Sequence, residues 1–531
     1  MKTLSNRNTY LVLFVIFILG FLLRVYPGNE NLIWSYDQAR DSVVIRSIID
    51  DKNIIIVGPQ TEFVGLSHGP LYYYLFSIFF HLGQSNLTIP LLAMIVLNLS
   101  SIIPIYLLAK SLSNGENRVG IIASFLFIIA YQQIEYARWL SNVSITVPFL
   151  AWFYYFLWKI INQKTANSDN LQNIIVPVLT GLSLALAIQG ELFLLYLIPI
   201  SYFCMYYYRI KFKKFLLFHI GLVFGLATFI IAEIKFGFLA TNTFINDFIF
   251  NDAGGVFDLN KKLLDYFTHL GLTTYQNIIG YNSVLGLISL FLILILFYKT
   301  RKNVNNNVFS FILILLFSHS ILFIFKYVNA VFLDLSITLP IILLFTLSIW
   351  FLIKTNKKIV AVGLLFLIII SQLFQLYSNT KNKTPMQIFN FHQGGILFSQ
   401  KKEIVNKIYE LVKNHSVEDN SSKFTLGVLG SPYGVQTVWA TIFENYLSNN
   451  PNEHKPDWYG FRALGYPYDS YFTKVDHPES IHVLIIEDNI LVLSNEIIVN
   501  EYISQLNKST EIINQIKIYG FIIQIRKPIE H

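Results

Sequence analysis

Long apolar runs recur along the chain as far as Tyr377, and they limit what it can fold into more than any other feature. The runs are Leu11–Tyr26, Leu91–Ala109, Phe215–Ile234, Ser283–Tyr298, Phe309–Phe325 and Val360–Tyr377. Each approaches the roughly 20 apolar residues that a membrane-spanning helix needs. Only 13% of the residues are charged, whereas a soluble domain carries about a quarter. The sequence therefore predicts an α-helical polytopic membrane protein.

Positive charge gathers in short loops between these runs. The basic loops contain Lys2 and Arg7, Arg209–Lys214, Lys299–Lys302, and Lys354 with Lys357 and Lys358. Such loops are cytoplasmic by the positive-inside rule. The net charge of +7 therefore indicates membrane topology, and we expect no nucleic-acid partner. The single Cys204 lies in an apolar run, which excludes a disulfide framework and a cysteine-based metal site.

The apolar segment His68–Gly83 decides the topology. At about 14 apolar residues it is short for a span, and if it crossed the membrane the basic loops from Arg209 onward would lie outside. We therefore predict a juxtamembrane helix, whose tyrosines suit the interface. About eleven spans result, near residues 10–26, 88–109, 118–134, 142–160, 172–189, 191–208, 215–235, 281–298, 308–326, 331–353 and 359–377. The N-terminus is then cytoplasmic in a multi-pass protein of the cell membrane.

The chain changes character after residue 378. Asn, Ser, Lys and Glu become frequent, and alternating apolar residues predict strands within Lys423–Gly430, Ile481–Asp488 and Lys517–Lys527. An amphipathic helix is predicted over Ser399–His415. We expect a membrane domain over residues 1–378, with a juxtamembrane first outer loop at 27–87, and a small extracytoplasmic α/β domain over 379–531.

The first outer loop is dense in charged residues, which are functional candidates beside a membrane. They include Asp37, Arg40, Asp41, Glu62 and His68. Three of them have an alternative structural role. Asp37 could be the N-cap of a helix over 38–49, a role compatible with a substrate contact. Asp41 could form a solvent-exposed ion pair with Arg40 or Arg46, and His68 could simply begin a helix before Gly69 and Pro70.

Three further polar segments fall at outer membrane ends in this topology: "IEYARWLSN" (134–142), "IQGEL" (188–192) and "AEIKFGF" (232–238). They carry Glu135, Arg138, Glu191, Glu233 and Lys235. The alternative role of Arg138 and Lys235 is to reach the membrane interface with their long side chains. A cationic site on this side could bind a lipid phosphate, which arginine does through paired hydrogen bonds.

These motifs resemble the lipid-linked-sugar glycosyltransferases of the GT-C class, in particular glycosyltransferase family 39, which contains the protein O-mannosyltransferases and the aminoarabinose transferases. "YDQARD" matches the family's acidic first-loop motif at Asp37, with Gln38 in place of the usual Glu. "HGPLYYY" matches its His-Pro-Pro-Leu motif from His68, with Gly for the first Pro. "YARWLSNVSITVPFLAWFYYFL" resembles the segment in which Arg138 is retained and Asn142 stands near the family's Asp.

The resemblance implies an inverting transferase that moves a sugar from a polyprenyl-phosphate donor to an extracytoplasmic protein, lipid or glycan. Asp37 would be the general base, with Asp41 and His68 as further catalytic candidates. The expected substrate-binding residues are Tyr36, Gln38, Arg40, Glu62, Glu135, Arg138, Asn142, Glu191 and Lys235. No cofactor is assigned, and a divalent metal is left open, because the family's zinc-binding Glu and His have no clear counterpart.

Two readings from other classes stay open beside the enzyme. A membrane transporter or flippase would place its polar residues near the bilayer midplane, often with repeats, whereas the candidates here gather at one membrane face and no repeat is visible. A non-catalytic binder of lipid-linked glycans would account for Gln38 and Asn142. The residues do not identify the sugar, the acceptor or the oligomeric state.

Overall fold

The computed structural model describes residues 6–28, 32–61, 63–162, 171–246, 259–300, 306–324, 331–382, 397–415, 423–430, 432–487 and 496–529. The chain forms two compact units. We call Met1–Tyr26, Ile54–Leu75 and Leu91–Ile388 the membrane unit, and Pro27–Asn53, Phe76–Pro90 and Phe389–His531 the C-terminal unit.

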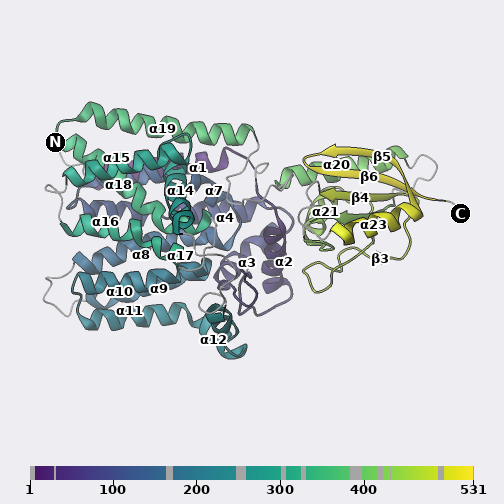
Figure 1. The fold of residues 1–531 in the computed structure, drawn as a ribbon, viewed down its shortest axis with the longest axis horizontal. Coiled ribbons are helices and arrows are strands. Elements are labelled where there is room, and N and C mark those ends of the chain that lie inside the picture. The colour runs from purple at the N-terminus through teal and green to yellow at the C-terminus, as the bar shows by residue number, and fades with distance from the viewer. Residues whose placement is uncertain are drawn as a thin grey trace. The chain divides into compact units, whose positions relative to one another are not determined.

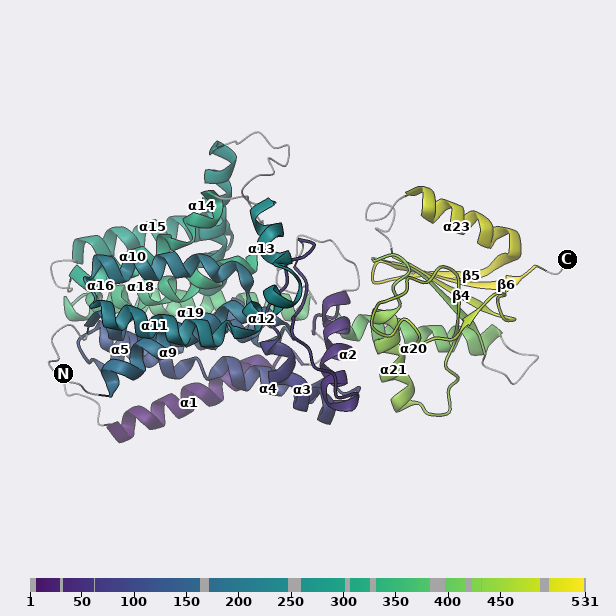
Figure 2. The same cartoon turned by 90° about the horizontal axis from the view of Figure 1, so that it is seen from below.

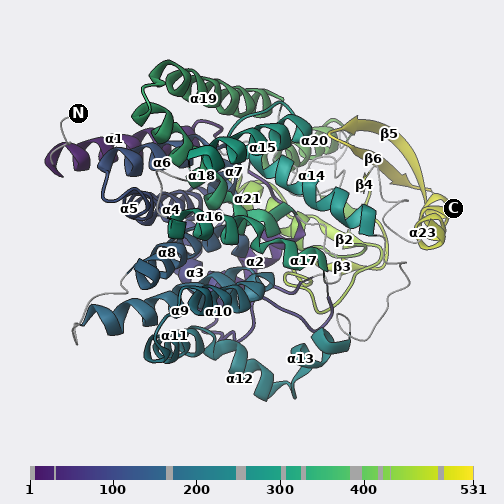
Figure 3. The ribbon, with the colours of Figure 1, turned by 60° about the vertical axis from the view of Figure 1, so that its left-hand side comes forward.

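The membrane unit is built from helices (Figures 1 and 3). They are α1 (Asn6–Val25), α4 (Thr88–Leu99), α5 (Ile102–Leu112), α6 (Asn117–Ile129), α7 (Tyr131–Arg138), α8 (Asn142–Asn162), α9 (Gln172–Gly190), η2 (Leu192–Tyr196), α10 (Leu197–Tyr207), α11 (Phe212–Gly225), α12 (Ala227–Lys235), α13 (Leu239–Phe244), α14 (Leu259–Asn277), α15 (Ser283–Thr300), α16 (Asn306–Ser318), α17 (Ser320–Ile324), η5 (Val331–Asp334), α18 (Leu335–Lys354) and α19 (Lys358–Lys381). Helices α3 (Leu71–Gly83) and α4 contribute residues to both units.

Six helical segments of the described chain are long and apolar enough to cross a membrane. They are Arg7–Val25, Thr88–Leu112, Asn142–Asn162, Gln172–Gly190, Leu335–Lys354 and Lys358–Lys381. Two more result if α6 with α7, bent by 61°, and α11 with α12, bent by 58°, each count as one span. The other three predicted spans coincide with apolar helices of 17 residues or fewer. The number of crossings and their orientation therefore stay predictions.

Helix α18 forms the core of the membrane unit. All of its side chains from Leu335 to Leu352 are buried, and the hydroxyl of Tyr154 on α8 donates a hydrogen bond of 2.7 Å to the carbonyl of Ser336. Helix α1, by contrast, exposes large apolar side chains such as Leu11 and Phe14. A helix that is apolar all round belongs inside a bundle, and an exposed apolar face suits lipid. The predicted helical membrane region is confirmed.

The C-terminal unit contains one six-stranded sheet, in the order β3-β2-β1-β4-β6-β5. The strands are β1 (Thr425–Leu429), β2 (Asp457–Tyr459), β3 (Lys474–Val475), β4 (His482–Glu487), β5 (Thr510–Ile518) and β6 (Phe521–Pro528). Strands β1 to β4 are parallel, with Leu426 opposite Val483, and β6 pairs antiparallel with β4 and β5. The strand order reverses between β1 and β4, which is the switch point of an open α/β sheet.

Helices cover both faces of this sheet (Figure 2). Helix α23 (Glu496–Ser509) lies on one face, and α20 (Phe398–His415) and α21 (Thr437–Asn449) lie on the other. Covered on both faces, β1 is buried along its whole length, as a parallel strand in an α/β fold should be. The predicted small C-terminal α/β region is thus confirmed.

Part of the first outer loop belongs to the C-terminal unit. Ile33 of the loop forms an antiparallel bridge with Leu397, the residue directly before α20 (Phe398–His415). The indole N–H of the buried Trp34 donates to the hydroxyl of Thr441 on α21, at 3.0 Å. Helix α2 (Tyr36–Asp50), which carries most of the loop's charged residues, is therefore attached to residues some 400 positions away in the sequence.

Candidate functional site

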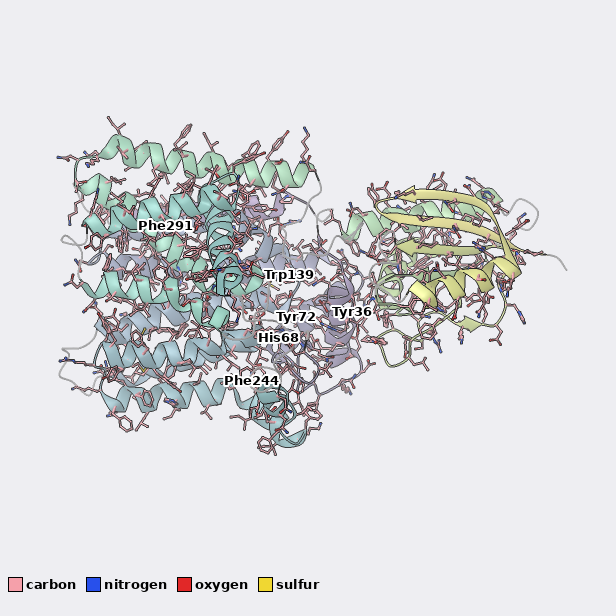
Figure 4. The ribbon with its side chains drawn as sticks, viewed as in Figure 1. Tyr36, His68, Tyr72, Trp139, Phe244 and Phe291 are labelled. Carbon is pink, nitrogen blue, oxygen red and sulfur yellow. The ribbon has the colours of Figure 1, made fainter. Side chains whose placement is uncertain are left out.

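The predicted site residues fall into two groups that belong to different units. Those on α2, in the C-terminal unit, are Tyr36, Asp37, Gln38, Arg40 and Asp41. Those in the membrane unit are His68, Glu135, Arg138, Asn142, Glu191 and Lys235. Figure 4 labels Tyr36 at the start of α2 and His68 in the loop before α3. Glu62 lies outside the described residues.

Helix α2 begins at a capping box. The side-chain oxygen of Gln38 accepts hydrogen bonds from the backbone N–H of Ser35, at 3.1 Å, and from its hydroxyl, at 2.6 Å. Ser and Gln three residues apart form this motif at many helix starts. Asp37 is therefore not the N-cap, which was its alternative structural role, because the Ser35–Gln38 pair starts the helix earlier and places Asp37 in the first turn. The helix dipole still favours its negative charge there.

Arg40 holds two carboxylates that differ in their exposure. Its guanidinium lies 3.0 Å from Asp37 and 2.8 Å from Asp41, and its Nε donates a further hydrogen bond of 2.9 Å to Asp41. The side chain of Asp37 is 51% exposed, whereas that of Asp41 is 2% exposed. Asp37 is thus an oriented carboxylate that solvent can reach, and Asp41 is buried.

Tyr36, next to Asp37, lines a small pocket of about 30 Å³ at the switch point of the sheet. Lys401 of α20 and Glu487, the last residue of β4, also line it. Burial lowers the pKa of Lys401 to about 8, although the charge of Glu487 opposes this shift. Burial raises the pKa of Tyr36 to about 12. The pocket has room for about one or two water molecules, so it can hold a small polar group only.

The loop that carries His68 packs tightly against the end of α9. The backbone N–H of Leu192 donates to Nδ1 of His68 at 3.1 Å, and the backbone N–H of Gly69 donates to the carbonyl of Gln189 at 2.9 Å. A Cβ at position 69 would overlap the side chain of Gln189. This close approach explains why Gly stands where the family motif has its first Pro.

Asn142 and Glu191 meet at the same end of α9. The amide of Asn142 donates to the carbonyl of Gly190 at 2.6 Å. The carboxylate of Glu191, which is fully buried, accepts from the backbone N–H of Phe193 at 3.1 Å and caps η2. The structure therefore brings His68, Asn142 and Glu191 together around the break between α9 and η2.

Arg138 lies inside the membrane unit and is only 3% exposed. Its guanidinium donates to the carbonyl of Arg24 at 2.7 Å, and Arg24 in turn binds Asn98 at 3.1 Å. Glu135 lies one turn before Arg138 on α7 and is partly buried.

Lys235 ends α12 and is exposed, with its ammonium 5.5 Å from the ring centroid of Phe236. Glu233 on the same helix accepts hydrogen bonds from the backbone N–H groups of Ala240 and Thr241, each at 3.1 Å, and so holds the start of α13. The structure thus gives Glu233 a local structural role and leaves Lys235 as an exposed cation.

One buried polar cluster was missed by the sequence reasoning. The carboxylate of Asp334 lies 2.9 Å from Nδ1 of His269 and 3.1 Å from Nε2 of His319, and it accepts a hydrogen bond of 3.1 Å from Thr273. Asp334 is fully buried at the start of α18. The available signal was an Asp directly before a long apolar run, which is a functional candidate beside a membrane.

The sequence motifs did not decide whether the protein binds a divalent metal, and the described residues form no cluster of metal ligands. The described part of the chain brings together no group of three or more His, Cys, Asp or Glu side chains that could hold one. In the cluster around Asp334, the carboxylate shares a hydrogen bond of 2.9 Å with Nδ1 of His269 and lies at ion-pair distance, 3.1 Å, from Nε2 of His319.

Solved structures provide the link to known proteins. ArnT from Cupriavidus metallidurans in the apo state matches with a TM-score of 0.55 and 10% identity, over 98% of each chain. The same protein bound to undecaprenyl phosphate matches with a TM-score of 0.53 and 9% identity, also over 98% of each chain. The apo oligosaccharyltransferase of Archaeoglobus fulgidus matches with a TM-score of 0.47 and 13% identity, over 83% of this chain and 64% of that one. Similarity of this last degree supports no inference.

No protein-family model matches the sequence, and no curated protein matches it. The similarity to known proteins is thus one of fold, and it extends over nearly the whole length of ArnT. This membrane protein therefore has the GT-C glycosyltransferase fold.

Proposed function

We propose that the protein is an integral-membrane glycosyltransferase, which moves a sugar from a polyprenyl-phosphate donor to an acceptor on the extracytoplasmic side. The proposal is supported by the GT-C fold, by the first-loop motifs around Asp37 and His68, and by a structural neighbour that binds undecaprenyl phosphate. Fold alone does not determine function, so the residues of α2 carry the argument.

The exposed carboxylate of Asp37 is the observation on which the proposed chemistry depends. The guanidinium of Arg40 lies 3.0 Å from this carboxylate and orients it. Among the described residues no other side chain forms a hydrogen bond or ion pair with it. As the acceptor hydroxyl attacks the anomeric carbon, Asp37 accepts its proton, and the bond from that carbon to the phosphate oxygen breaks. The phosphate leaves as an anion, so no strong general acid is needed. Direct displacement inverts the anomeric centre.

The lipid phosphate needs a cation that it can reach. Lys235 is exposed, whereas the guanidinium of Arg138 is buried and binds the carbonyl of Arg24. We therefore assign Lys235 to direct phosphate contact, and Arg138 to holding α7 in place. His68, whose Nδ1 is held by the backbone of Leu192, would use its other ring nitrogen to orient the leaving phosphate.

The test is turnover of radiolabelled polyprenyl-phosphate sugars by the purified protein in detergent. Mannose, glucose, galactose and aminoarabinose donors are each supplied with cell-envelope extract as acceptor. Asp37→Asn should lower the rate of sugar release by about 10²–10⁴-fold, the usual contribution of a general base. Asp51→Asn is the matched control, because Asp51 is an exposed carboxylate at the opposite end of α2.

Equal turnover by the wild type and Asp37→Asn would remove Asp37 from the role of base. If no donor turns over while the protein binds polyprenyl phosphate tightly, the glycosyltransferase proposal fails and a transporter or non-catalytic binder replaces it. Turnover that Asp37→Asn abolishes and Asp51→Asn preserves would support both the enzyme class and the residue.

A further inference from the structure

A second and larger pocket lies in the C-terminal unit, on the face of the sheet that α23 covers. Its volume is about 400 Å³. Residues that follow β2 and β3, such as Phe461 and Asp476, line it together with residues of α23. Open α/β sheets bind ligands outside the carboxyl ends of their strands, and ligand pockets measure roughly 300–1,000 Å³. The place and size of this pocket are therefore those of a binding site.

The walls of the pocket are fixed by close packing. Tyr459 and Tyr502 pack on a buried cluster that includes Leu429 and Leu484, and the hydroxyl of Tyr502 donates to the carbonyl of Tyr459 at 3.4 Å. Gly460 has φ +121°, and a Cβ there would collide with Tyr502. Glycine at this position thus lets α23 approach the sheet and form one wall.

Aromatic rings provide flat apolar surfaces in this pocket. The rings of Tyr433 and Phe461 are parallel, with centroids 5.1 Å apart and an interplanar angle of 4°. Phe461 is 53% exposed, so a ligand in the pocket can reach its ring. The C–H face of a pyranose ring is flat and weakly apolar, so such rings are suitable platforms for it.

Polar side chains surround these rings. The pocket is lined by Lys474, Asp476, Glu501 and Gln505. Within the described residues, none of these four side chains forms a hydrogen bond or an ion pair. They offer donors and acceptors in the mixture that vicinal hydroxyls require. Lys474 carries one positive charge, and Asp476 and Glu501 carry one negative charge each, so the lining has a net charge of −1. This charge disfavours a phosphate or a polyanion.

We propose that this pocket is a carbohydrate-binding subsite, which holds an uncharged pyranose unit of a glycan. The aromatic platforms stack against the sugar ring, and the carboxylates of Asp476 and Glu501 accept hydrogen bonds from its hydroxyls. We take this glycan to be the acceptor of the sugar, and that step rests on the proposed function. Carbohydrate binding by the pocket does not depend on it.

Binding is measured with the full-length protein in detergent by isothermal titration. The probes are mannotriose, maltotriose and chitotriose, with a sialylated trisaccharide as the anionic comparison and an uncharged hexapeptide as the peptide comparison. At least one neutral trisaccharide should bind. Phe461→Ala should raise its Kd about tenfold, which corresponds to a strong aromatic contact, and Glu501→Gln should also raise it. The matched controls Ile512→Ala and Glu511→Gln alter exposed side chains on β5, outside the pocket, and should leave the Kd unchanged.

The outcomes separate this inference from the proposed function. Asp37→Asn should bind the trisaccharide as the wild type does while losing sugar transfer. Lost binding in the pocket variants, with no donor turnover by any form, would keep the subsite and overturn the transferase. Absence of binding by all three neutral probes, equal binding by Phe461→Ala, or preference for the anionic sugar or the peptide would overturn the subsite.

Discussion

Two aspartates one turn apart on α2 show what residue patterns can and cannot predict. Asp37 and Asp41 are four residues apart, so a helical pattern places them on the same face, and the sequence made both of them catalytic candidates. The structure separates them by exposure, 51% against 2%. Burial depends on what packs against α2, and no local pattern encodes that. The capping role of Gln38 could be found from the sequence, because Ser35 precedes it by three residues. The exposure of Asp37 could not, because it depends on tertiary packing.

Asp41→Asn should reduce stability rather than chemistry. The substitution removes a buried charge that receives two contacts from Arg40, and such losses cost about 1–3 kcal/mol. The midpoint of thermal unfolding in detergent should fall, while donor turnover per folded molecule stays near that of the wild type. Asp37→Asn should show the reverse pattern. Lost turnover in a well-folded Asp41→Asn protein would contradict this division of roles.

His482 should make the C-terminal unit sensitive to acid. Burial lowers its pKa to about 3 in the folded chain, whereas an unfolded histidine titrates near 6.5. Between these values the unfolded chain binds more protons, so stability is lost as the pH falls from about 6.5 toward 3. The slope from this one group is about 1.4 kcal/mol per pH unit.

His482→Asn should remove that share of the pH dependence, and Asn can still hydrogen-bond Thr425, which lies 3.0 Å from Nδ1. The measurement is urea unfolding of the full chain between pH 4.5 and 7.5, followed by amide exchange in β1 and β4. His477→Asn changes an exposed histidine and should keep the wild-type slope. Equal slopes for His482→Asn and the wild type would show that the pKa of His482 does not differ between the folded and the unfolded chain.

At the scale of elements, hydrophobic periodicity predicted a helix and two strands correctly, whereas the turn residues did not reveal the hairpin between β5 and β6. The helix predicted over 399–415 is α20 (Phe398–His415), and two predicted strands contain β1 and β4. The stretch Lys517–Lys527 is instead a hairpin, because Tyr519 and Gly520 both have positive φ and turn β5 into β6. Tyrosine is uncommon at positive φ, and the Asn-Gly or Asp-Gly signal of such turns is absent.

Arg46 links α2 to α21 through an ion pair. Arg46 forms a bidentate pair with Glu444, at 3.0 and 2.9 Å, and also donates to the hydroxyl of Tyr468 at 2.9 Å. Both side chains are partly buried. A double-mutant cycle of Arg46→Ala and Glu444→Ala should give a coupling free energy of about 1–3 kcal/mol, measured by urea unfolding. Lysine lacks the planar guanidinium that binds both carboxylate oxygens, so Arg46→Lys should retain only part of this coupling free energy. Additive effects of the two alanine substitutions would contradict a direct pair.

At the scale of the whole molecule, the long-range pairings lay beyond sequence reasoning. The attachment of the first outer loop to residues near 397 and 441 joins segments some 400 positions apart. The order of the six strands, although they all lie within residues 425–528, is likewise set by pairings between strands that are not neighbours in the sequence. No alternation or charge pattern reports such a pairing. The helical membrane region was predictable because apolar runs are local, and the first-loop motif was predictable because its residues are adjacent.

Removal of residues 389–531 should therefore loosen α2, although α2 lies far from them in the sequence. Trp34 would lose its bond to Thr441, Arg46 would lose Glu444, and the bridge from Ile33 would vanish. Since each hydrogen bond contributes about 1 kcal/mol, amide exchange in residues 34–50 should accelerate by more than tenfold, while exchange in α18 stays unchanged. Full protection of α2 in the truncated protein would mean that the membrane unit alone folds this helix, and the base on α2 would then be independent of the C-terminal sheet. Acceleration would instead make the C-terminal unit part of what positions Asp37, so that loss of its sheet would reduce sugar transfer without touching the membrane helices.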